Sequence, residues 1–435
     1  YYSNNNVISN NSIYGNGDDG IYIYSDSSYN TIANNSICGN YNDGICLRGD
    51  SNNNIIINNI CENNDNGLYL WGSWNNVISG NSIRENSVYG IYLDSSGGNN
   101  ITNNVCEDNY DGIHFYDYSD DNIISNNNIC GNSNDGIYLD NSGSNTITNN
   151  SICGNNYDGI YLDYSNDNII SNNNISENNA DSIYLRYSDN NIVSNNIICE
   201  NNANGIYLHY SDNNVIYLNN FINNTDNFYS YDSTNIWNST EPITYVYNGN
   251  QYTNYMGNYW SDYQGLDTNG DGIGDIPYEI DSDKDYYPLM QPWQNYFAEV
   301  EMPSVEISTD KQYYTAYETM LISISLENPD GLQEVGFLWQ LNILSYNLSF
   351  TVVERTILLS PNFNRTLTLQ WTLPDFGTSF SASWYVALFN ASTSELISED
   401  TAEWRYISLK EGGEAQIGEI QIEKLKGLGL LEYLT

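Results

Sequence analysis

The stretch "DGIYLDYSNDNIISNNNISENNADSIYLRYSDNN", residues 158 to 191, holds two near-copies of one phrase, because "YLDYS" returns as "YLRYS" after a run of Asn, Ser and Ile. The same phrase extends through the first half of the chain. A glycine followed by an Ile-Tyr-Leu-like triplet recurs every 22 to 24 residues, at Gly20, Gly44, Gly67, Gly90, Gly112, Gly136, Gly159 and Gly205, with Ser182 in the one missing position. A fixed period of this length indicates a solenoid built from identical structural units.

Within each repeat the apolar residues form three short groups that alternate with polar residues, which is the period of a β-strand. The first group is a pair such as Ile160 and Leu162, and the second is the Ile of an Asn-x-Ile triplet. The third is the residue after the next Asn pair, which gives an expected interior column of Ile37, Ile60, Ile83, Val105, Ile129, Ile152, Ile175 and Ile198. Three strands per repeat predict an all-β chain with a parallel β-helix of about nine to ten coils.

Asparagine is abundant at one fixed place in the repeat. When coils stack about 4.8 Å apart, identical positions form columns, and an Asn column can hydrogen-bond to itself from coil to coil. Such a column is expected for Asn30, Asn54, Asn76, Asn99, Asn122, Asn145, Asn168, Asn191 and Asn214. Asn also tolerates the left-handed backbone of tight corners. We therefore interpret the Asn content as architecture and not as low-complexity disorder.

The "N-x-I-x-x-N-x-I-x-x-N…GIYL" repeat resembles the parallel β-helix (PbH1) repeats of NosD-like and CASH-type proteins, within the pectin-lyase-like β-helices, over about residues 1 to 225. The segment "GNYWSDYQGLDTNGDGIGDIPYEIDSDKDYYPLM", residues 257 to 290, strengthens the resemblance, since similar stretches close the β-helix in archaeal surface members. The resemblance implies a right-handed β-helix, an archaeal source and a place at the cell surface.

The charge balance restricts the partners. The chain carries 55 acidic and 11 basic residues, a net charge of -44, whereas nucleic-acid binding requires a basic surface. This balance favours a solvated surface in a salty or calcium-bearing environment. No apolar run reaches the length of a membrane span, and the first residues already lie inside a coil, so we expect a preceding N-terminal piece. Together with the resemblance, sequons at Asn238, Asn347, Asn364 and Asn390 favour glycosylation and an extracellular location.

Six of the seven cysteines, Cys38, Cys61, Cys106, Cys130, Cys153 and Cys199, follow directly after the third-group residue. Neighbouring coils would place two such Cα atoms about 4.8 Å apart, within the range of a disulfide. Cys38 with Cys61, and two of Cys106, Cys130 and Cys153, are candidates for bridges. Small semi-buried thiols, links between subunits and binding of a soft metal stay open as alternatives. NosD relatives are linked to copper, but no Cys-x-x-Cys motif or His cluster supports a copper site here.

The segment "DTNGDGIGD" places Asp267, Asn269, Asp271, the Ile273 carbonyl and Asp275 at the 1, 3, 5, 7 and 9 spacing of a calcium loop. Tyr278 stands where an EF-hand has its bidentate Glu, so a dockerin- or thrombospondin-like loop is expected, completed by water or by Asp281, Asp283 or Asp285. An unmetallated Asx-turn loop is the alternative. Structural calcium is the only cofactor that we predict, and no organic cofactor is expected.

Alternating runs such as "TMLISISLENP" and "SASWYVALFN" predict several strands of an immunoglobulin-like β-sandwich. We therefore expect four segments: a parallel β-helix at 1–228, a capping region with the calcium loop at 229–300, the sandwich at 301–407, and a tail at 408–435. The tail alternates like a strand and then becomes apolar, which favours a contact with another subunit.

Two columns of the repeat carry candidate function. Asp140, Asp163, Arg186 and His209 stand two residues after Tyr138, Tyr161, Tyr184 and Tyr207 on consecutive coils. Polysaccharide lyases and hydrolases of similar β-helices use carboxylates with Arg, Lys or His, so the first column is a candidate catalytic site. Charge balance within a regular ladder is the simpler interpretation. The tyrosines are candidates for stacking on sugars or for a subunit contact.

Three functions follow from these features. The leading interpretation is a non-enzymatic structural protein of the cell surface, in a layer, sheath or filament, that self-assembles through tyrosine faces and termini. The alternative is an extracellular β-helix protein that binds or cleaves polysaccharide. A copper-handling, NosD-like role is the third.

Overall fold

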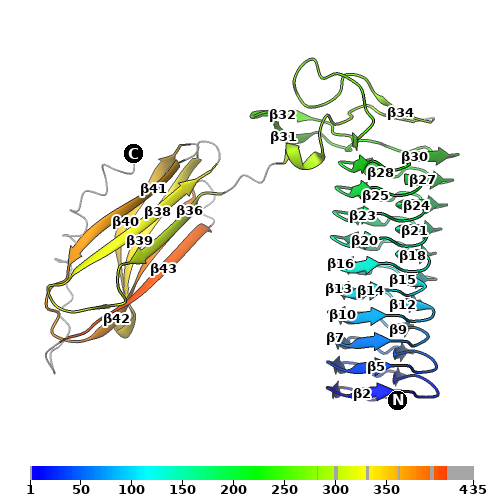
Figure 1. Cartoon of the computed structure of the whole chain (residues 1–435), viewed down its shortest axis with the longest axis horizontal. Coiled ribbons are helices and arrows are strands. Elements are labelled where there is room, and N and C mark those ends of the chain that lie inside the picture. Colours follow the sequence, from blue (N-terminus) through cyan, green and yellow to red (C-terminus); the bar gives the residue numbers. More distant parts are fainter. Residues whose placement is uncertain are drawn as a thin grey trace. The chain divides into compact units, whose positions relative to one another are not determined.

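The computed structural model describes residues 2–281, 283–297, 302–329, 333–360, 363–391 and 396–408. The chain divides into two compact units, Tyr1–Ala298 and Glu299–Thr435. The first unit is a stack of parallel coils in which each coil contributes one strand to each of three sheets (Figure 1). This confirms the predicted parallel β-helix.

The three sheets are named A, B and C in the order in which the chain enters them. Sheet A contains β1 (Val7–Ser9), β4 (Thr31–Ala33), β7 (Ile55–Ile57), β10 (Val77–Ser79), β13 (Asn100–Thr102), β16 (Ile123–Ser125), β19 (Thr146–Thr148), β22 (Ile169–Ser171), β25 (Ile192–Ser194) and β28 (Val215–Tyr217). Sheet B contains β2 (Ser12–Tyr14), β5 (Ser36–Cys38), β8 (Ile60–Glu62), β11 (Ser82–Arg84), β14 (Val105–Glu107), β17 (Asn128–Cys130), β20 (Ser151–Cys153), β23 (Asn174–Ser176), β26 (Ile197–Cys199), β29 (Asn220–Ile222) and β33 (Tyr259–Trp260). Sheet C contains β3 (Ile21–Tyr24), β6 (Ile45–Arg48), β9 (Leu68–Trp71), β12 (Tyr89–Asp94), β15 (Asp111–Tyr116), β18 (Ile137–Asp140), β21 (Ile160–Asp163), β24 (Ile183–Arg186), β27 (Asn204–His209) and β30 (Asp226–Tyr231).

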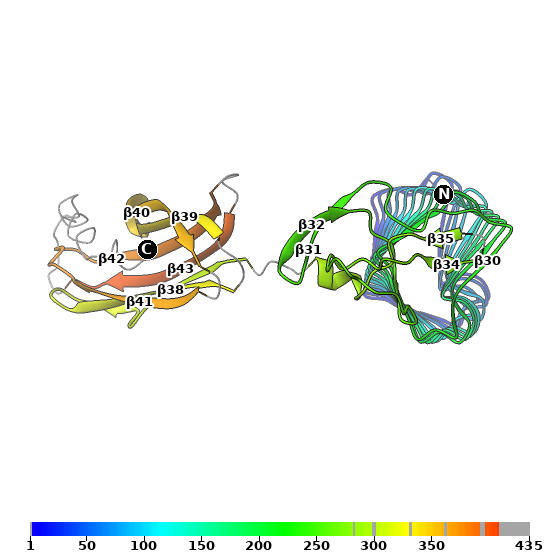
Figure 2. The same cartoon turned by 90° about the horizontal axis from the view of Figure 1, so that it is seen from above.

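Equivalent residues of successive coils pair one to one, as for Ile147 with Ile170 and Ile152 with Ile175. Viewed along the stack in Figure 2, the coils superimpose into one cross-section. From Ile32 to Ile216 the inward residues of the three sheets are fully buried and form one continuous, mostly aliphatic core, against which Ile8 and Ile13 of the first coil pack partly exposed. The period-2 alternation therefore places apolar side chains inside and leaves the outward positions free to vary.

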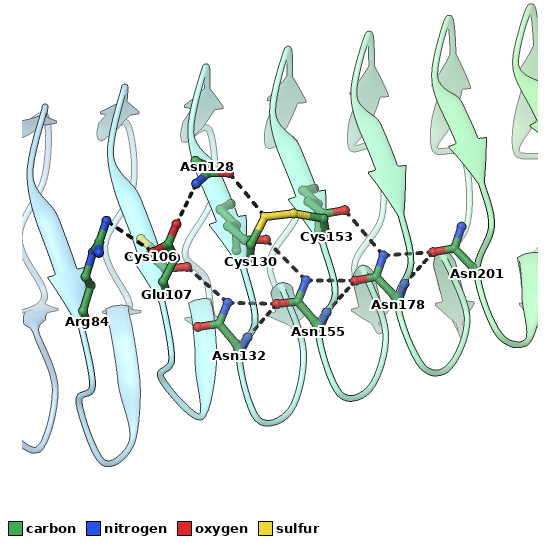
Figure 3. The surroundings of a disulfide bond; sticks show 12 residues. Arg84, Cys106, Glu107, Asn128, Cys130, Asn132, Cys153, Asn155, Asn178 and Asn201 are labelled. Atoms are coloured by element: carbon green, nitrogen blue, oxygen red, sulfur yellow. Dashed lines mark hydrogen bonds and ion pairs between the residues drawn. A yellow bond between two sulfur atoms is a disulfide. The ribbon is translucent and has the colours of Figure 1, made fainter.

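The predicted Asn column hydrogen-bonds from coil to coil. Asn168 Oδ1 accepts from the backbone N–H of Asn145 at 2.8 Å, and Asn191 Oδ1 accepts in the same way from Asn168. Two further Asn ladders occupy the other corners, and Figure 3 shows part of one, which comprises Asn132, Asn155, Asn178 and Asn201. Each ladder satisfies buried backbone donors at a corner where strands have ended.

The expected third interior column is wrong at two coils. Register pairs Ile37 with Cys61 and Cys106 with Ile129, so both cysteines point into the core and are fully buried. Ile60 is therefore outward and 43% exposed, and Val105 likewise lies on the outer face of β14. Cys is a small apolar residue that replaces Ile in a core without a polar penalty.

Residues 232–297, called here the terminal segment, cover the last coil. Its elements are β31 (Ile243–Tyr247), β32 (Asn250–Asn254), β34 (Tyr278–Ile280), β35 (Asp283–Asp285) and the 3₁₀ helix η1 (Trp293–Tyr296), besides β33. Trp260 stacks on Phe221 of the last coil with ring centroids 4.4 Å apart, so the aliphatic core ends on aromatic rings. The hairpin β31–β32 turns at Asn248 and Gly249, both with positive φ, as Asn-Gly hairpin turns require. Since β30 ends at Tyr231, the predicted β-helix boundary at 228 lies inside a strand.

Three alternate aspartates accept hydrogen bonds at the end of the β-helix, one from β30 and two from within the terminal segment. Asp281 accepts a hydrogen bond from Ser230 N, and Asp283 accepts from Asn235 N at 2.9 Å. The fully buried Asp285 accepts from Asn258 N and from Trp260 Nε1. These carboxylates thus help to close the coil end, and a part for them in a calcium shell stays a prediction.

The second unit consists of two sheets that share one apolar core. One sheet has the order β36 (Ser304–Thr309), β38 (Thr319–Asn328), β41 (Phe363–Thr372). The other has the order β37 (Tyr313–Tyr314), β43 (Leu396–Tyr406), β42 (Phe380–Asn390), β39 (Gln333–Ile343), β40 (Leu348–Leu359), with η2 (Leu344–Tyr346) between β39 and β40. The immunoglobulin-like fold of this unit stays a prediction, and the tail after residue 408 lies outside the described residues.

Candidate functional site

The outer face of sheet C carries the tyrosine column. Tyr138, Tyr161, Tyr184 and Tyr207 pair in register on β18, β21, β24 and β27. Their ring centroids are 4.8, 4.7 and 4.5 Å apart, with interplanar angles of 12°, 4° and 5°. Because the rings stack on one another, their faces are occupied, and they present ring edges and hydroxyl groups to the outside. This arrangement disfavours the expected stacking of sugars on these rings.

A second tyrosine stack runs beside the first. Tyr164, Tyr187 and Tyr210 follow β21, β24 and β27, with ring centroids 4.8 and 5.2 Å apart. All three have positive φ, between 47° and 51°. Sequence reasoning missed this stack, although its signal is the second Tyr of "YLDYS" and "YLRYS". The two stacks lie on either side of the charged column along each strand.

The candidate column Asp140, Asp163, Arg186 and His209 is brought together as predicted by the register of sheet C. Arg186 Nη1 donates to Asp163 Oδ2 at 2.8 Å, and the guanidinium lies 5.0 Å from the ring centre of Tyr187. His209 Nδ1 lies 3.5 Å from Tyr184 Oη.

Burial governs the acidity of this column. Desolvation raises the pKa of Asp163, although the Arg186 charge opposes the change, and desolvation also raises the pKa of Asp140. Asp163 Oδ1 is covered and has no hydrogen-bond partner among the described residues. The carboxyl groups of this column are therefore easier to protonate than ordinary surface aspartates.

On two coils the position of the tyrosine column is occupied by His114 and Cys46 instead. Each of these side chains bonds to an aspartate of its own coil. His114 Nδ1 lies 2.8 Å from Asp111 Oδ2, and both residues are buried. Cys46 in the same way contacts Asp43, and Asp19, Asp43 and Cys46 can each bring one ligand atom within 4.8 Å of the others. Sequence reasoning missed both pairs, whose common signal is an Asp three residues before the His or Cys.

Those aspartates belong to a buried column along the corner before sheet C. The backbone N–H of each following coil donates to the carboxylate before it, from Asp135 N to Asp111, from Asp158 N to Asp135 and from Asp181 N to Asp158. Desolvation and then the neighbouring carboxylate raise the pKa of Asp135 to about 7 and that of Asp158 to about 8. The column thus caps corner amides, and burial makes Asp135 and Asp158 easier to protonate than exposed aspartates.

The six cysteines do not share one position. Cys130 and Cys153 form a disulfide on the outer face of sheet B, with Cα atoms 4.6 Å apart (Figure 3). Cys61 and Cys106 point into the core and are free thiols. The proposed pairing of Cys38 with Cys61 is therefore wrong, because Cys38 lies on the outer face of the same sheet. Cys199 is also a free thiol and is partly exposed.

The predicted calcium loop closes on itself through carboxylate oxygens. Asp267 accepts from the backbone N–H of Gly270 at 2.7 Å and of Gly272 at 2.8 Å. Asp275 accepts from Thr268 N, while Asp271 accepts from Ile273 N and from the Asn269 amide. These are Asx-type turns, which the unmetallated alternative also requires. The oxygen-rich donor set suits calcium, and calcium binding stays a prediction.

The predicted glycosylation sites differ in exposure. Asn347 and Asn364 are exposed, and the Asn364 amide donates to Glu327. Asn238 and Asn390 are of intermediate exposure. Nothing in these contacts tests the modification itself.

Comparisons with known proteins agree with the fold. Residues 90–265 match the family model "Periplasmic copper-binding protein (NosD)", and residues 1–129 match "Right handed beta helix region". Together with the three parallel sheets, these matches define a β-helix repeat protein. No curated protein matches the chain.

Among solved structures, a double mutant of the periplasmic alginate epimerase AlgG is 21% identical, with a TM-score of 0.48, and the alignment covers 54% of this chain and 68% of that one. The A-module of the mannuronan C-5 epimerase AlgE6 of Azotobacter vinelandii is 17% identical, with a TM-score of 0.45 and coverage of 48% and 63%. A DFA-IIIase of Arthrobacter chlorophenolicus A6 is 15% identical, with a TM-score of 0.38 and coverage of 47% and 63%. At these identities the likeness is one of fold. Among the described residues, no helix has the length and apolar composition to cross a membrane.

Proposed function

We propose that this β-helix protein binds polysaccharide outside the cytoplasm, on the outer face of sheet C between β18 and β27. The observation that carries the proposal is the pair of tyrosine stacks that flank Asp163, Arg186 and His209. Their hydroxyl groups repeat once per coil, about every 4.8 Å. A row of hydroxyl, carboxylate and guanidinium groups offers donors and acceptors to the hydroxyl groups of a sugar chain.

The charge of the chain selects the kind of polysaccharide. With a net charge of -44, the protein repels a polyanion. Arg84 and Arg48 lie on other coils, so Arg186 is the only Arg or Lys between β18 and β27, and its charge is matched by Asp163. A neutral polysaccharide is therefore the expected ligand, held by hydrogen bonds and not by ring stacking.

Affinity electrophoresis in gels that contain neutral or acidic polysaccharides tests this proposal. Arg186→Ala and Tyr187→Ala are expected to abolish the retardation, because they remove a bidentate donor and a hydroxyl from the face. Arg84→Ala is the matched control, since Arg84 forms a comparable ion pair with Glu107 on sheet B. Equal mobility of wild type and Arg186→Ala in every gel would refute the proposed site.

Cleavage of the bound chain is a second candidate function. Asp140 and Asp163 face outward on adjacent coils, and burial raises the pKa of both carboxyl groups. A carboxyl group with a raised pKa is easier to protonate, and a protonated carboxyl group can act as a general acid on a glycosidic oxygen. Asp163→Asn should then remove the release of reducing sugar, whereas absence of turnover in the wild type would rule out cleavage and leave binding as the proposed function.

The other interpretations have less support. The two matched family models and the three structures named above describe no surface-layer, sheath or filament protein, so they do not support the leading interpretation from the sequence. Copper(I) prefers several soft ligands, whereas the cluster of Asp19, Asp43 and Cys46 supplies one thiol beside two carboxylates. Burial raises the pKa of the Cys46 thiol, which opposes the thiolate that a metal requires. These residues do not fit copper.

A further inference from the structure

The outer face of sheet A is free of charge along its whole length. Each of its ten strands has three residues, of which the first and third point outward. The first position is mostly β-branched and apolar, and Ile55, Val77, Ile123, Ile169 and Ile192 are 36 to 45% exposed. The third position is mostly Ser or Thr. No Asp, Glu, Lys, Arg or His occupies any of these outward positions on the ten strands.

The other two faces differ from this one. Sheet C displays Asp140, Asp163 and Arg186, and sheet B displays the ion pair of Arg84 with Glu107. In a chain with 55 acidic residues, an uncharged face over ten coils is a separate feature that neither the core nor the polysaccharide site explains. A long exposed apolar stripe on a soluble protein marks an interaction surface.

We propose that a second copy of this chain docks on the outer face of sheet A, so that the protein is a dimer of β-helices packed sheet to sheet. The net charge of the chain is the reason for choosing a second copy as the partner. Two copies at -44 each repel one another wherever their charged faces meet, and sheet A is the face whose outward strand positions carry no carboxylate. Asp121 and Asp167, at the corner before sheet A, supply the polar rim that such interfaces have.

The area of the face is sufficient for a dimer. Nine steps of about 4.8 Å give a length of about 43 Å, and a width of about 15 Å for strand and corners gives on the order of 650 Å² per copy. The total of about 1,300 Å² lies within the range of specific interfaces, about 1,200 to 2,000 Å².

The shape of the face also suits a copy of itself. Its strands pair in uninterrupted register from Val7 to Val215. The first-position column, apolar except at Thr31, Asn100 and Thr146, therefore forms a straight ridge beside a column of mostly Ser and Thr. A two-fold axis places the ridge of each copy into the furrow of the other, in the manner of an isologous interface. Two sheets packed in this way lie about 10 Å apart.

Analytical ultracentrifugation of the full chain between 1 and 100 μM tests the proposal. We expect a species of twice the 49.3 kDa chain mass, and tighter association in 0.5 M than in 0.05 M NaCl, because salt screens the repulsion between the acidic surfaces. Ile123→Lys combined with Ile169→Lys places four charges in the interface and should weaken dimerisation by about 100-fold or more.

Ile60→Lys combined with Ile197→Lys is the matched control, because it makes the same change at outward positions of sheet B and should leave the dimer intact. Circular dichroism checks that each variant keeps its β structure; if the first pair unfolds, Ile55→Lys with Ile192→Lys replaces it. A wild-type chain that stays monomeric from 1 to 100 μM overturns the proposal. It does so also where another part of the chain or a flat polymer covers the face. A dimer that persists in all sheet A variants overturns it as well.

Discussion

Asn127→Ala should destabilise the β-helix far more than Asn126→Ala, although the two residues are neighbours of the same type. The Asn127 side chain makes four hydrogen bonds. Its Oδ1 accepts from Asn104 N at 2.8 Å and Asn104 Nδ2 at 3.1 Å, and its Nδ2 donates to Ile101 O at 2.9 Å and Asn150 Oδ1 at 3.0 Å. Asn126 instead occupies an exposed corner with a φ of 57°.

The expected magnitudes follow from these contacts. Each of the four bonds contributes about 1 kcal/mol, and buried donors left without partners add about 1 to 2 kcal/mol, so Asn127→Ala should lower the free energy of unfolding by about 5 kcal/mol. Alanine at position 126 loses the tolerance of Asn for the left-handed backbone, at about 1 kcal/mol. Its backbone N–H still donates to Thr148 O.

Urea unfolding followed by circular dichroism measures both values by linear extrapolation. Hydrogen exchange of peptides from β13, β16 and β19 then shows whether the loss is local, as expected for a solenoid in which each coil contacts its neighbours. If the two variants differ by less than about 0.5 kcal/mol, then the Asn ladder does not hold the coils together.

Three further outcomes are expected. Cys106→Ser should cost about 2 kcal/mol because it buries a hydroxyl in the aliphatic core, whereas Cys38→Ser on the outer face should be nearly neutral; equal effects in urea unfolding would contradict the assigned register. The pKa of Asp158 in the folded chain, about 8, lies above the ordinary value near 4, so its contribution to stability is present below pH 4 and is lost as the pH rises through 8. Urea midpoints at pH 5 and pH 9 should therefore fall with pH, and less so in Asp158→Asn, while a flat profile would show that the column titrates normally. Calcium at about 100 times its Kd should stabilise the terminal segment by about 2.7 kcal/mol, and loss of this effect in Asp271→Ala, but not in Asp226→Ala, would establish the loop as the site.

The sequence predicts the coils well because stacking requires the same residue types at equivalent positions of every coil. An interior column tolerates only apolar residues and an Asn ladder needs Asn on both neighbours, so the pattern repeats in the chain as it does in space. The prediction was wrong at Cys61 and Cys106 because it assigned the interior position to the neighbouring Ile60 and Val105. Counting two residues from the ladder members Asn59 and Asn104 gives the correct frame, since Asn59 bonds to Asn35 in the coil before it.

Contacts that leave the repeat could not be predicted in the same way. Asp283 bonds to Asn235, and Asp285 bonds to Trp260, across 48 and 25 residues. No local period records such a pairing, and the "DSDKD" run is equally consistent with a calcium shell. The second tyrosine stack was visible in the sequence, but its tyrosines themselves have positive φ, and strand alternation alone does not predict the direction of such side chains.

The outer faces of the sheets differ in the residues that they carry for the same physical reason. Inward positions are fixed by packing and corners by the Asn ladders, so only the two outward positions of each strand are free to carry function. A column amplifies any such choice, because one residue type repeated on adjacent coils makes a row with a spacing of about 4.8 Å. Sheet C uses this freedom for tyrosine hydroxyls beside Asp163 and Arg186, while the outward strand positions of sheet A carry no charge.

If polysaccharide binding and dimerisation are both correct, Ile123→Lys with Ile169→Lys should abolish the dimer and leave polysaccharide binding per chain unchanged, because the two faces belong to different sheets. A joint loss of both in a folded variant would show that one surface serves both purposes, and would refute the assignment of separate faces.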